Sequence, residues 1–212
     1  GKDMKNVFII PKSKTYMDDM QNQLERAKHI VTIGAGFIGV EVSDELHKAG
    51  KDVTLVEKLP MILGLAYNQD ISDMATLELT ERGVKIVCGT GIKEIIGNGK
   101  AEAVLLEDDR KLPADAVILT MGYEPNSKLA ADAGLDISDR GFIKVDEYMR
   151  TADPNIFAVG DCAEKRDFVT RKPSEIMLAS TACAEARIAG MNVFKLSAIK
   201  TLSGTISIFA TA

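Results

Sequence analysis

The fold of this chain is decided by residues 29–40, which read HIVTIGAGFIGV. The β-branched run at residues 29–33 is typical of a parallel strand that is covered on both faces. A glycine-rich turn follows, and a helix is predicted from Phe37 to about Ala49, where Gly50 is well placed to end it. Strand, glycine turn and helix in this order are the context in which Gly-x-Gly-x-x-Gly binds a dinucleotide.

The glycines of this loop have separate physical roles. Gly34 permits the tight turn, Gly36 lets a pyrophosphate approach the backbone, and Gly39 lets helix and strand pack closely. The helix N-terminus offers free N–H groups and a partial positive charge to the phosphates. NAD- and FAD-binding domains share this fingerprint, so the loop alone leaves the dinucleotide undecided. The predicted loop residues are Gly34, Ala35, Gly36, Phe37, Ile38 and Gly39.

The second predicted strand, residues 52–57, ends on an acidic residue. Glu57 lies about 20 residues beyond the loop, where a carboxylate accepts hydrogen bonds from both hydroxyls of the adenosine ribose. A carboxylate at this place also repels a 2′-phosphate, which favours NAD(H) over NADP(H). Lys58 weakens this preference, because a neighbouring cation tolerates the phosphate.

The elements that follow extend the same pattern and then depart from it. A helix at about residues 70–82 and a strand at 84–88 complete a β-α-β-α-β order with short connections, which predicts a parallel sheet with right-handed crossovers. Residues 91–113 contain short strands with hairpin turn chemistry at Gly97-Asn98-Gly99, which predicts an antiparallel β-meander. Residues 116–120 return as a core strand.

Further elements are predicted on either side of this region. Near the start of the chain a short strand is predicted, and Ser13 after it is placed to cap a helix that continues to about Lys28. The second half of the chain is predicted to contain a short helix after Ser127 and one long helix that Gly190 ends. The other predicted ranges are strands at 7–10, 142–145, 156–159 and 206–210, and the long helix at about 173–189.

The composition is that of an ordinary globular protein. The 212 residues are 46% hydrophobic and 27% charged, and the formal net charge is −5. The acidic balance argues against a nucleic-acid-binding surface, and no apolar run approaches the ~20 residues of a membrane span. No signal-peptide core is visible. The three cysteines lack metal-ligand or Cys-x-x-Cys spacing, which predicts a reduced, cytoplasmic protein with no bound metal.

Three segments resemble one family, the two-dinucleotide pyridine nucleotide-disulfide oxidoreductases, and within it the branch of NADH oxidase, NADH peroxidase and coenzyme A-disulfide reductase. Residues 33–41, IGAGFIGVE, resemble its NAD-site loop. Residues 120–126, TMGYEPN, resemble the segment by which the chain leaves the NAD domain. Residues 151–161, TADPNIFAVGD, resemble the second FAD motif. The implied fold is α/β: a Rossmann-like parallel sheet with helices on one side and an antiparallel β-meander, plus a partial FAD-domain half.

The resemblance implies roles for further residues. Glu41 would lie near the nicotinamide, and Gly122 would let the backbone approach it. Asp161 would bind hydroxyl groups of FAD, because a carboxylate accepts two hydrogen bonds at once. The start of the long helix would lie near the flavin pyrimidine, with backbone N–H groups of Leu178, Ala179 and Ser180. Neither this resemblance nor the residues themselves identify a catalytic side chain in the chain.

The resemblance also implies a longer parent protein. In this family NADH reduces flavin, which passes electrons to oxygen, peroxide or a disulfide, and the parent is expected to be a homodimer. A second glycine fingerprint and the redox cysteine of the family are not found in the 212 residues. We therefore expect a piece that binds NADH, does not retain FAD and is inactive alone. The expected division is 1–12, a connecting strand from the FAD domain; 13–122, the NAD domain; 123–195, the second half of the FAD domain; and 196–212, the start of an interface domain.

One structural consequence and one alternative function follow. Residues from about Tyr123 onward would lack partner strands, so we expect self-association through this half. The alternative function is an NAD-binding regulatory or scaffold module without redox turnover. The motif that ends at Asp161 separates the two, because a module that only senses NAD has no need of it.

Overall fold

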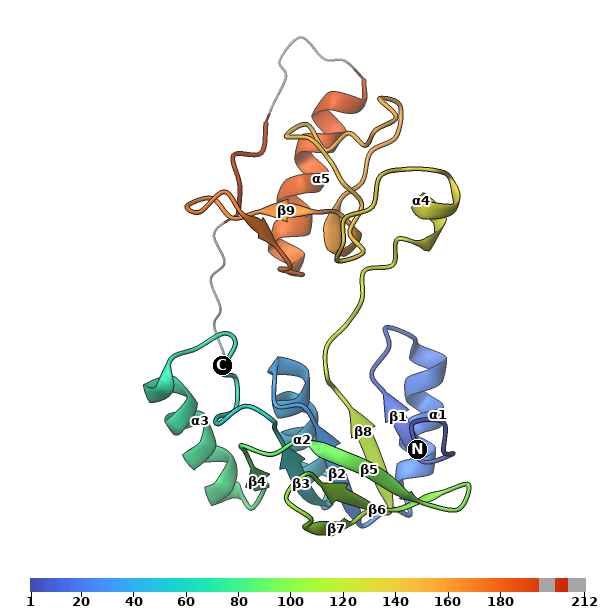
Figure 1. Ribbon diagram of the computed structural model, residues 1–212, viewed down its shortest axis with the longest axis vertical. Coiled ribbons are helices and arrows are strands. Elements are labelled where there is room, and N and C mark those ends of the chain that lie inside the picture. Colours follow the sequence, from blue (N-terminus) through green and yellow to red (C-terminus); the bar gives the residue numbers. More distant parts are fainter. Residues whose placement is uncertain (195–200, 206–212) are drawn as a thin grey trace. The chain divides into compact units, whose positions relative to one another are not determined.

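The computed structural model describes residues 1–194 and 201–205, and it divides the chain into two compact units (Figure 1). The first unit is Gly1–Tyr123 and the second is Glu124–Ala212. Each unit is described below by itself.

The first unit is built on a five-stranded parallel sheet with the strand order β1-β8-β2-β3-β4. Ile33 at the end of β2 lies opposite Val56 of β3 and Leu119 of β8, so the carboxyl ends of the central strands form one edge. The strands are β1 (Val7–Ile9), β2 (His29–Ile33), β3 (Asp52–Val56), β4 (Lys85–Val87) and β8 (Ala116–Leu119).

Three helices cover one face of this sheet. They are α1 (Lys14–Leu24), α2 (Phe37–Lys48) and α3 (Gln69–Arg82). The predicted cap of α1 is confirmed, because the Ser13 hydroxyl accepts a hydrogen bond from the Tyr16 N–H. The α3 helix ends at Gly83, which adopts a left-handed conformation with φ of 110°. The order of these strands and helices along the chain confirms the predicted β-α-β-α-β arrangement.

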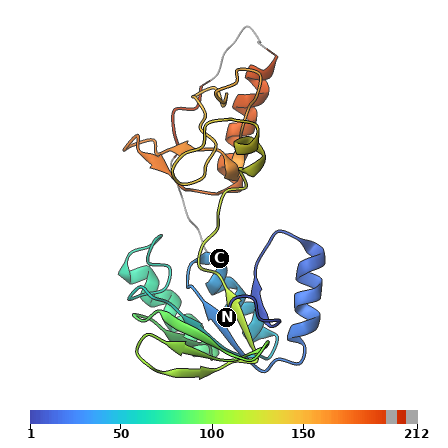
Figure 2. The ribbon, with the colours of Figure 1, turned by 45° about the vertical axis from the view of Figure 1, so that its right-hand side comes forward.

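The meander covers the opposite face. It consists of β5 (Ile92–Gly97), β6 (Ala101–Leu106) and β7 (Lys111–Pro113), which pair antiparallel (Figure 2). Val104 and Leu106 of β6 are fully buried in a cluster with Val31 and Val117 of the parallel sheet. The predicted fold class, an α/β fold with a parallel sheet, helices and an antiparallel meander, is confirmed, and the structure adds that the meander packs on the face opposite the helices.

Residues 1–12 are part of this first unit. The β1 strand pairs in parallel with β8 and forms an edge of the sheet. The buried Asn6 amide donates to the carbonyls of Ala101 and Asp115 at 2.9 and 2.5 Å, and its oxygen accepts from the Ala101 N–H at 2.6 Å. This segment, which was expected to connect from the FAD domain, therefore also ties the meander to the sheet.

The second unit contains shorter elements. They are α4 (Lys128–Asp132), the 3-10 turn η1 (Gly160–Cys162), β9 (Lys165–Arg166), β10 (Pro173–Ser174) and α5 (Ala179–Val193). The expected strands at 142–145 and 156–159 form only isolated bridges: Ile143 bridges Ile137 and Ala163, and Phe157 bridges Arg150. Between the two segments Asp146 turns the chain, because its carboxylate accepts from the N–H groups of Tyr148 and Arg150.

The long helix begins later than predicted. Pro173 and Ser174 form β10, which pairs with β9, so α5 starts only at Ala179. The prediction failed because the strand partner, Lys165–Arg166, cannot be recognised from the local pattern. Gly190 was expected to end the helix but lies inside it. The expected strand at 206–210 and the division after residue 195 lie outside the described residues.

Candidate functional site: the glycine loop and its surroundings

The glycine loop joins β2 to α2 at the carboxyl edge of the parallel sheet. Gly34 has φ of 100°, and a Cβ there would lie 2.8 Å from the Thr120 carbonyl oxygen. A Cβ on Gly39 would overlap the Gly34 carbonyl oxygen. Gly36, in contrast, has open space at its Cβ position. Gly34 and Gly39 are thus needed to close the loop, while Gly36 leaves the surface over the loop free for a ligand.

The first turn of α2 has no side-chain cap. Gly36 is the N-cap residue, and the first hydrogen bond of the helix runs from the Val40 N–H to its carbonyl at 3.0 Å. A helix that begins without a capping side chain can accept an anionic group at its N-terminus. Phe37 packs its ring edge-to-face against Tyr67 at 5.9 Å, while Ala35 is buried and Ile38 is exposed.

Glu57 lies directly against this loop. One carboxylate oxygen accepts a hydrogen bond from the Ala35 N–H at 2.6 Å, and the other accepts from the Leu59 N–H at 2.8 Å. A carboxylate has about four acceptor positions, so both oxygens keep capacity for a ribose diol. Sequence reasoning assigned Glu57 to the ribose alone and did not predict that it also holds the loop.

Lys58, the neighbour of Glu57 in sequence, forms an ion pair with the meander. Its ammonium donates to a carboxylate oxygen of Glu107 at 3.2 Å, and both side chains are largely exposed. Glu107 follows β6 in the segment 91–113 for which the sequence predicts a meander. The spacing of 49 residues between the two explains why no local pattern could reveal the pair.

Thr120 joins the strand end to the loop. Its hydroxyl lies 2.9 Å from the Ile33 carbonyl oxygen and 2.8 Å from that of Gly34. Gly122 follows with φ of 105° and is exposed, as is Glu41 on α2. The structure thus brings Gly122 and the loop to the same edge of the sheet through Thr120.

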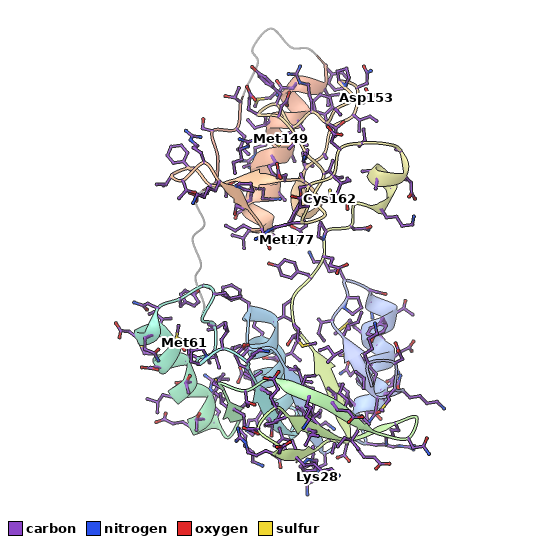
Figure 3. The ribbon with its side chains drawn as sticks, in the orientation of Figure 1. Lys28, Met61, Met149, Asp153, Cys162 and Met177 are labelled. Carbon is purple, nitrogen blue, oxygen red and sulfur yellow. The ribbon has the colours of Figure 1, made fainter. Side chains whose placement is uncertain are left out.

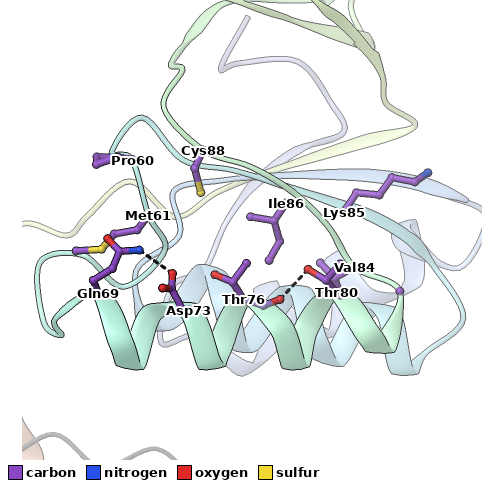
Figure 4. Close-up of a pocket in the computed structure, with 11 residues that line it drawn as sticks. Pro60, Met61, Gln69, Asp73, Thr76, Thr80, Val84, Lys85, Ile86 and Cys88 are labelled. Carbon is purple, nitrogen blue, oxygen red and sulfur yellow. Dashed lines mark hydrogen bonds between the residues drawn. The ribbon is translucent and has the colours of Figure 1, made fainter.

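A groove of about 550 Å³ lies in the same unit, between α3 and β4 (Figure 4). Pro60, Met61 and Cys88 lie at one end, and Lys85 lies at the other. Burial raises the pKa of the Cys88 thiol, so Cys88 is not activated as a nucleophile. The groove contains neither the glycine loop nor Glu57.

The second predicted motif ends in the turn η1 of the second unit. Gly160 has φ of 78°, Asp161 is half-buried, and the thiol of Cys162 donates to the Val159 carbonyl at 3.5 Å (Figure 3). The α5 helix begins with the N-cap Leu178, followed by the exposed Ala179 and Ser180.

A buried ion pair holds this turn, and sequence reasoning missed it. Lys165 and Glu185 have side chains that are 1% exposed, with 3.7 Å between the ammonium and one carboxylate oxygen. The other oxygen of Glu185 accepts from the Gly160 N–H at 2.7 Å. Lys165 donates to the carbonyls of Gly160 at 2.5 Å and Ala163 at 2.9 Å. Burial raises the pKa of Glu185. The two residues fix the backbone beside Asp161 and connect it to α5.

Within residues 1–194 and 201–205, no group of three or more His, Cys, Asp or Glu side chains is arranged to hold a metal ion. No helix in that part of the chain is both long and apolar enough to cross a membrane.

Residues 3–186 match the family model of the pyridine nucleotide-disulphide oxidoreductases. The chain belongs to this family. It is 34% identical over 197 residues to an NADH oxidase from Methanocaldococcus jannaschii, an alignment that covers 91% of the chain and 43% of that protein. It is 30% identical to an NADH oxidase from Enterococcus faecalis, with the same coverage of both proteins.

Two solved structures are similar to this chain in fold. An NAD-dependent persulfide reductase from A. fulgidus is 31% identical with a TM-score of 0.89, over 97% of this chain and 38% of that one. A water-forming NADH oxidase from Lactobacillus brevis, solved with NADH, is 27% identical with a TM-score of 0.84, over 92% and 43%. The chain spans less than half the length of these relatives.

Proposed function

We propose that this chain is the NAD(H)-binding portion of an FAD-dependent NADH oxidoreductase, in which hydride passes from NADH to flavin and electrons then pass to oxygen, peroxide or a disulfide. The observation that carries the proposal is the contact of Glu57 with the Ala35 N–H at 2.6 Å. It places the acidic residue and the phosphate-binding loop side by side, as an adenosine diphosphate moiety requires.

The first unit would bind NADH with separate groups for separate parts of the molecule. The backbone around Gly36 and the α2 N-terminus would hold the pyrophosphate. Glu57 would accept hydrogen bonds from the ribose hydroxyls of adenosine. Glu41 and Gly122 would lie toward the nicotinamide, as the family resemblance implies. Lys58 is engaged with Glu107, which supports NADH over NADPH.

The residues of the second unit fit part of a flavin site. Asp161 is half-buried in a turn whose backbone is held by Glu185 and Lys165, and its carboxylate would accept hydrogen bonds from flavin hydroxyls. Leu178, Ala179 and Ser180 begin α5 and would offer backbone N–H groups. Bound flavin supplies hydride acceptance and onward electron transfer. We propose that the 212 residues alone bind NADH and do not retain FAD.

The proposal is tested by titrating the chain with NADH and following nicotinamide fluorescence. We expect saturable binding, and Glu57→Gln should weaken it at least ~tenfold, because a carboxylate that accepts several hydrogen bonds is lost. Glu94→Gln is the matched control, since Glu94 is an exposed carboxylate on the meander. Absence of saturable binding would refute the proposal. Binding of NADH by a longer protein that carries no flavin would favour a regulatory module.

A further inference from the structure

Glu107 belongs to the meander but lies at the adenosine end of the proposed NAD site. One carboxylate oxygen accepts a hydrogen bond from the Gly91 N–H at 3.2 Å, and the other accepts from the Lys58 ammonium at 3.2 Å. The Glu107 N–H also donates to the Gly91 carbonyl at 2.9 Å. Both the backbone and the side chain of Glu107 are therefore bonded to the same glycine.

Gly91 provides the space that this arrangement needs. It is buried, and a Cβ added there would lie 2.8 Å from both carboxylate oxygens of Glu107. The carboxylate therefore rests directly on the Cα of Gly91. This contact restricts the Glu107 side chain, although the side chain remains 48% exposed.

The backbone on both sides of Lys58 is held in place. The Glu57 N–H donates to the Val87 carbonyl at 2.8 Å, and the Leu59 carbonyl accepts from the Gly89 N–H at 2.9 Å. Lys58 therefore emerges from a segment that is bonded to the end of β4. Its neighbour Glu57 is the residue proposed to read the adenosine ribose. The structure thus places the positive charge of Lys58 next to Glu57 in sequence and the negative charge of Glu107 against Lys58.

We propose that Glu107 is a specificity-determining residue that favours NADH over NADPH by engaging Lys58. This inference rests on the proposed NADH site. A free ammonium next to Glu57 would attract the 2′-phosphate of NADPH, whereas an ammonium paired with Glu107 has its charge balanced. Glu57, Lys58 and Glu107 together carry a net charge of about −1 at neutral pH, which opposes a phosphate group.

The experiment compares dissociation constants of NADH and NADPH for the 212-residue chain and its variants. Glu107→Gln keeps an acceptor for the Gly91 N–H and removes the charge that engages Lys58. Because the pair is exposed, we expect NADPH to bind about three- to fivefold more tightly, with NADH binding changed less than about twofold. The gain should shrink at high ionic strength.

Two controls isolate the mechanism. Asp109→Asn removes a carboxylate from the same turn, but Asp109 pairs with Lys93, so the ratio of the two constants should stay unchanged. In a Lys58→Met background, Glu107→Gln should improve NADPH binding by a smaller factor than it does when Lys58 is present. An unchanged ratio in Glu107→Gln, or an equal gain in the Lys58→Met background, would overturn the inference. Failure of the unmodified chain to bind NADH would instead refute the proposed function.

Discussion

The two units stabilise a loop by different kinds of contact. In the first unit, close packing shapes the glycine loop: Gly34 and Gly39 permit close contact, the Thr120 hydroxyl bonds the strand end to it, and the half-buried Glu57 carboxylate accepts from the Ala35 N–H. In the second unit, a fully buried ion pair of Lys165 and Glu185 holds the turn before Asp161. The first loop thus combines packing with one partly exposed carboxylate, whereas the second turn depends on two charges that are both buried.

The largest effect on binding and stability is expected at Gly39, where close packing leaves no space for a side chain. Gly39→Val should abolish NADH binding and destabilise the first unit by more than ~2 kcal/mol, because its side chain would overlap the Gly34 carbonyl. Urea denaturation and NADH titration measure the two effects. Gly36→Ala is the matched change, since its Cβ position is open. It should leave stability within about 1 kcal/mol and weaken only ligand binding. Equal destabilisation by both variants would contradict the packing argument.

In the second unit, the largest loss of stability is expected at the buried ion pair of Lys165 and Glu185. Lys165→Met should destabilise this unit by about 3–5 kcal/mol, because it leaves Glu185 buried without its counter-charge. Hydrogen exchange should show the loss in the second unit, while NADH binding by the first stays unchanged. Adding Glu185→Gln should recover part of the stability. If the double variant is no more stable than Lys165→Met alone, the charge argument is wrong.

The pH dependence of stability reports the contribution of the Glu185 carboxyl group to the second unit. Burial raises its pKa above the ordinary 4.5, so the folded state binds its proton more tightly than the unfolded state. This contribution is therefore most favourable below pH 4.5 and declines as pH rises toward the raised pKa. Measured from pH 4 to 7, the stability of the unmodified second unit relative to Glu185→Gln should fall with increasing pH. A constant difference would show that the carboxyl is not perturbed.

Self-association is expected to be the smallest effect. The second unit exposes the apolar residues Val169 and Phe194, which are 78% and 80% exposed. We expect sedimentation velocity to detect concentration-dependent association, and Val169→Ser to reduce it. Leu65→Ser in the first unit, where Leu65 is 93% exposed, is the control and should leave it unchanged. A monomer at all concentrations would contradict the prediction.

Local signals explain which predictions succeeded. The helix starts near Ser13 and Phe37 follow from a capping serine and from a glycine turn within a few residues, and both agree with the structure. The start of α5 was predicted too early, because the pairing of Ser174 with Lys165 depends on a distant strand. The ion pair of Glu107 was not predicted for a similar reason, since its partner Lys58 belongs to another element.

The sequence by itself determined the glycine loop, the acidic residue at the end of the strand that follows it and the order of helices and strands in the first unit. These features depend on glycine positions and hydrophobic period, which act over short stretches of chain. Only the tertiary structure decided that Glu57 closes the loop through Ala35, that Glu107 engages Lys58 and that Lys165 pairs with Glu185. Each of these contacts joins residues 20 to 49 positions apart, and a hydrogen bond or ion pair depends on distances in space that no local pattern contains.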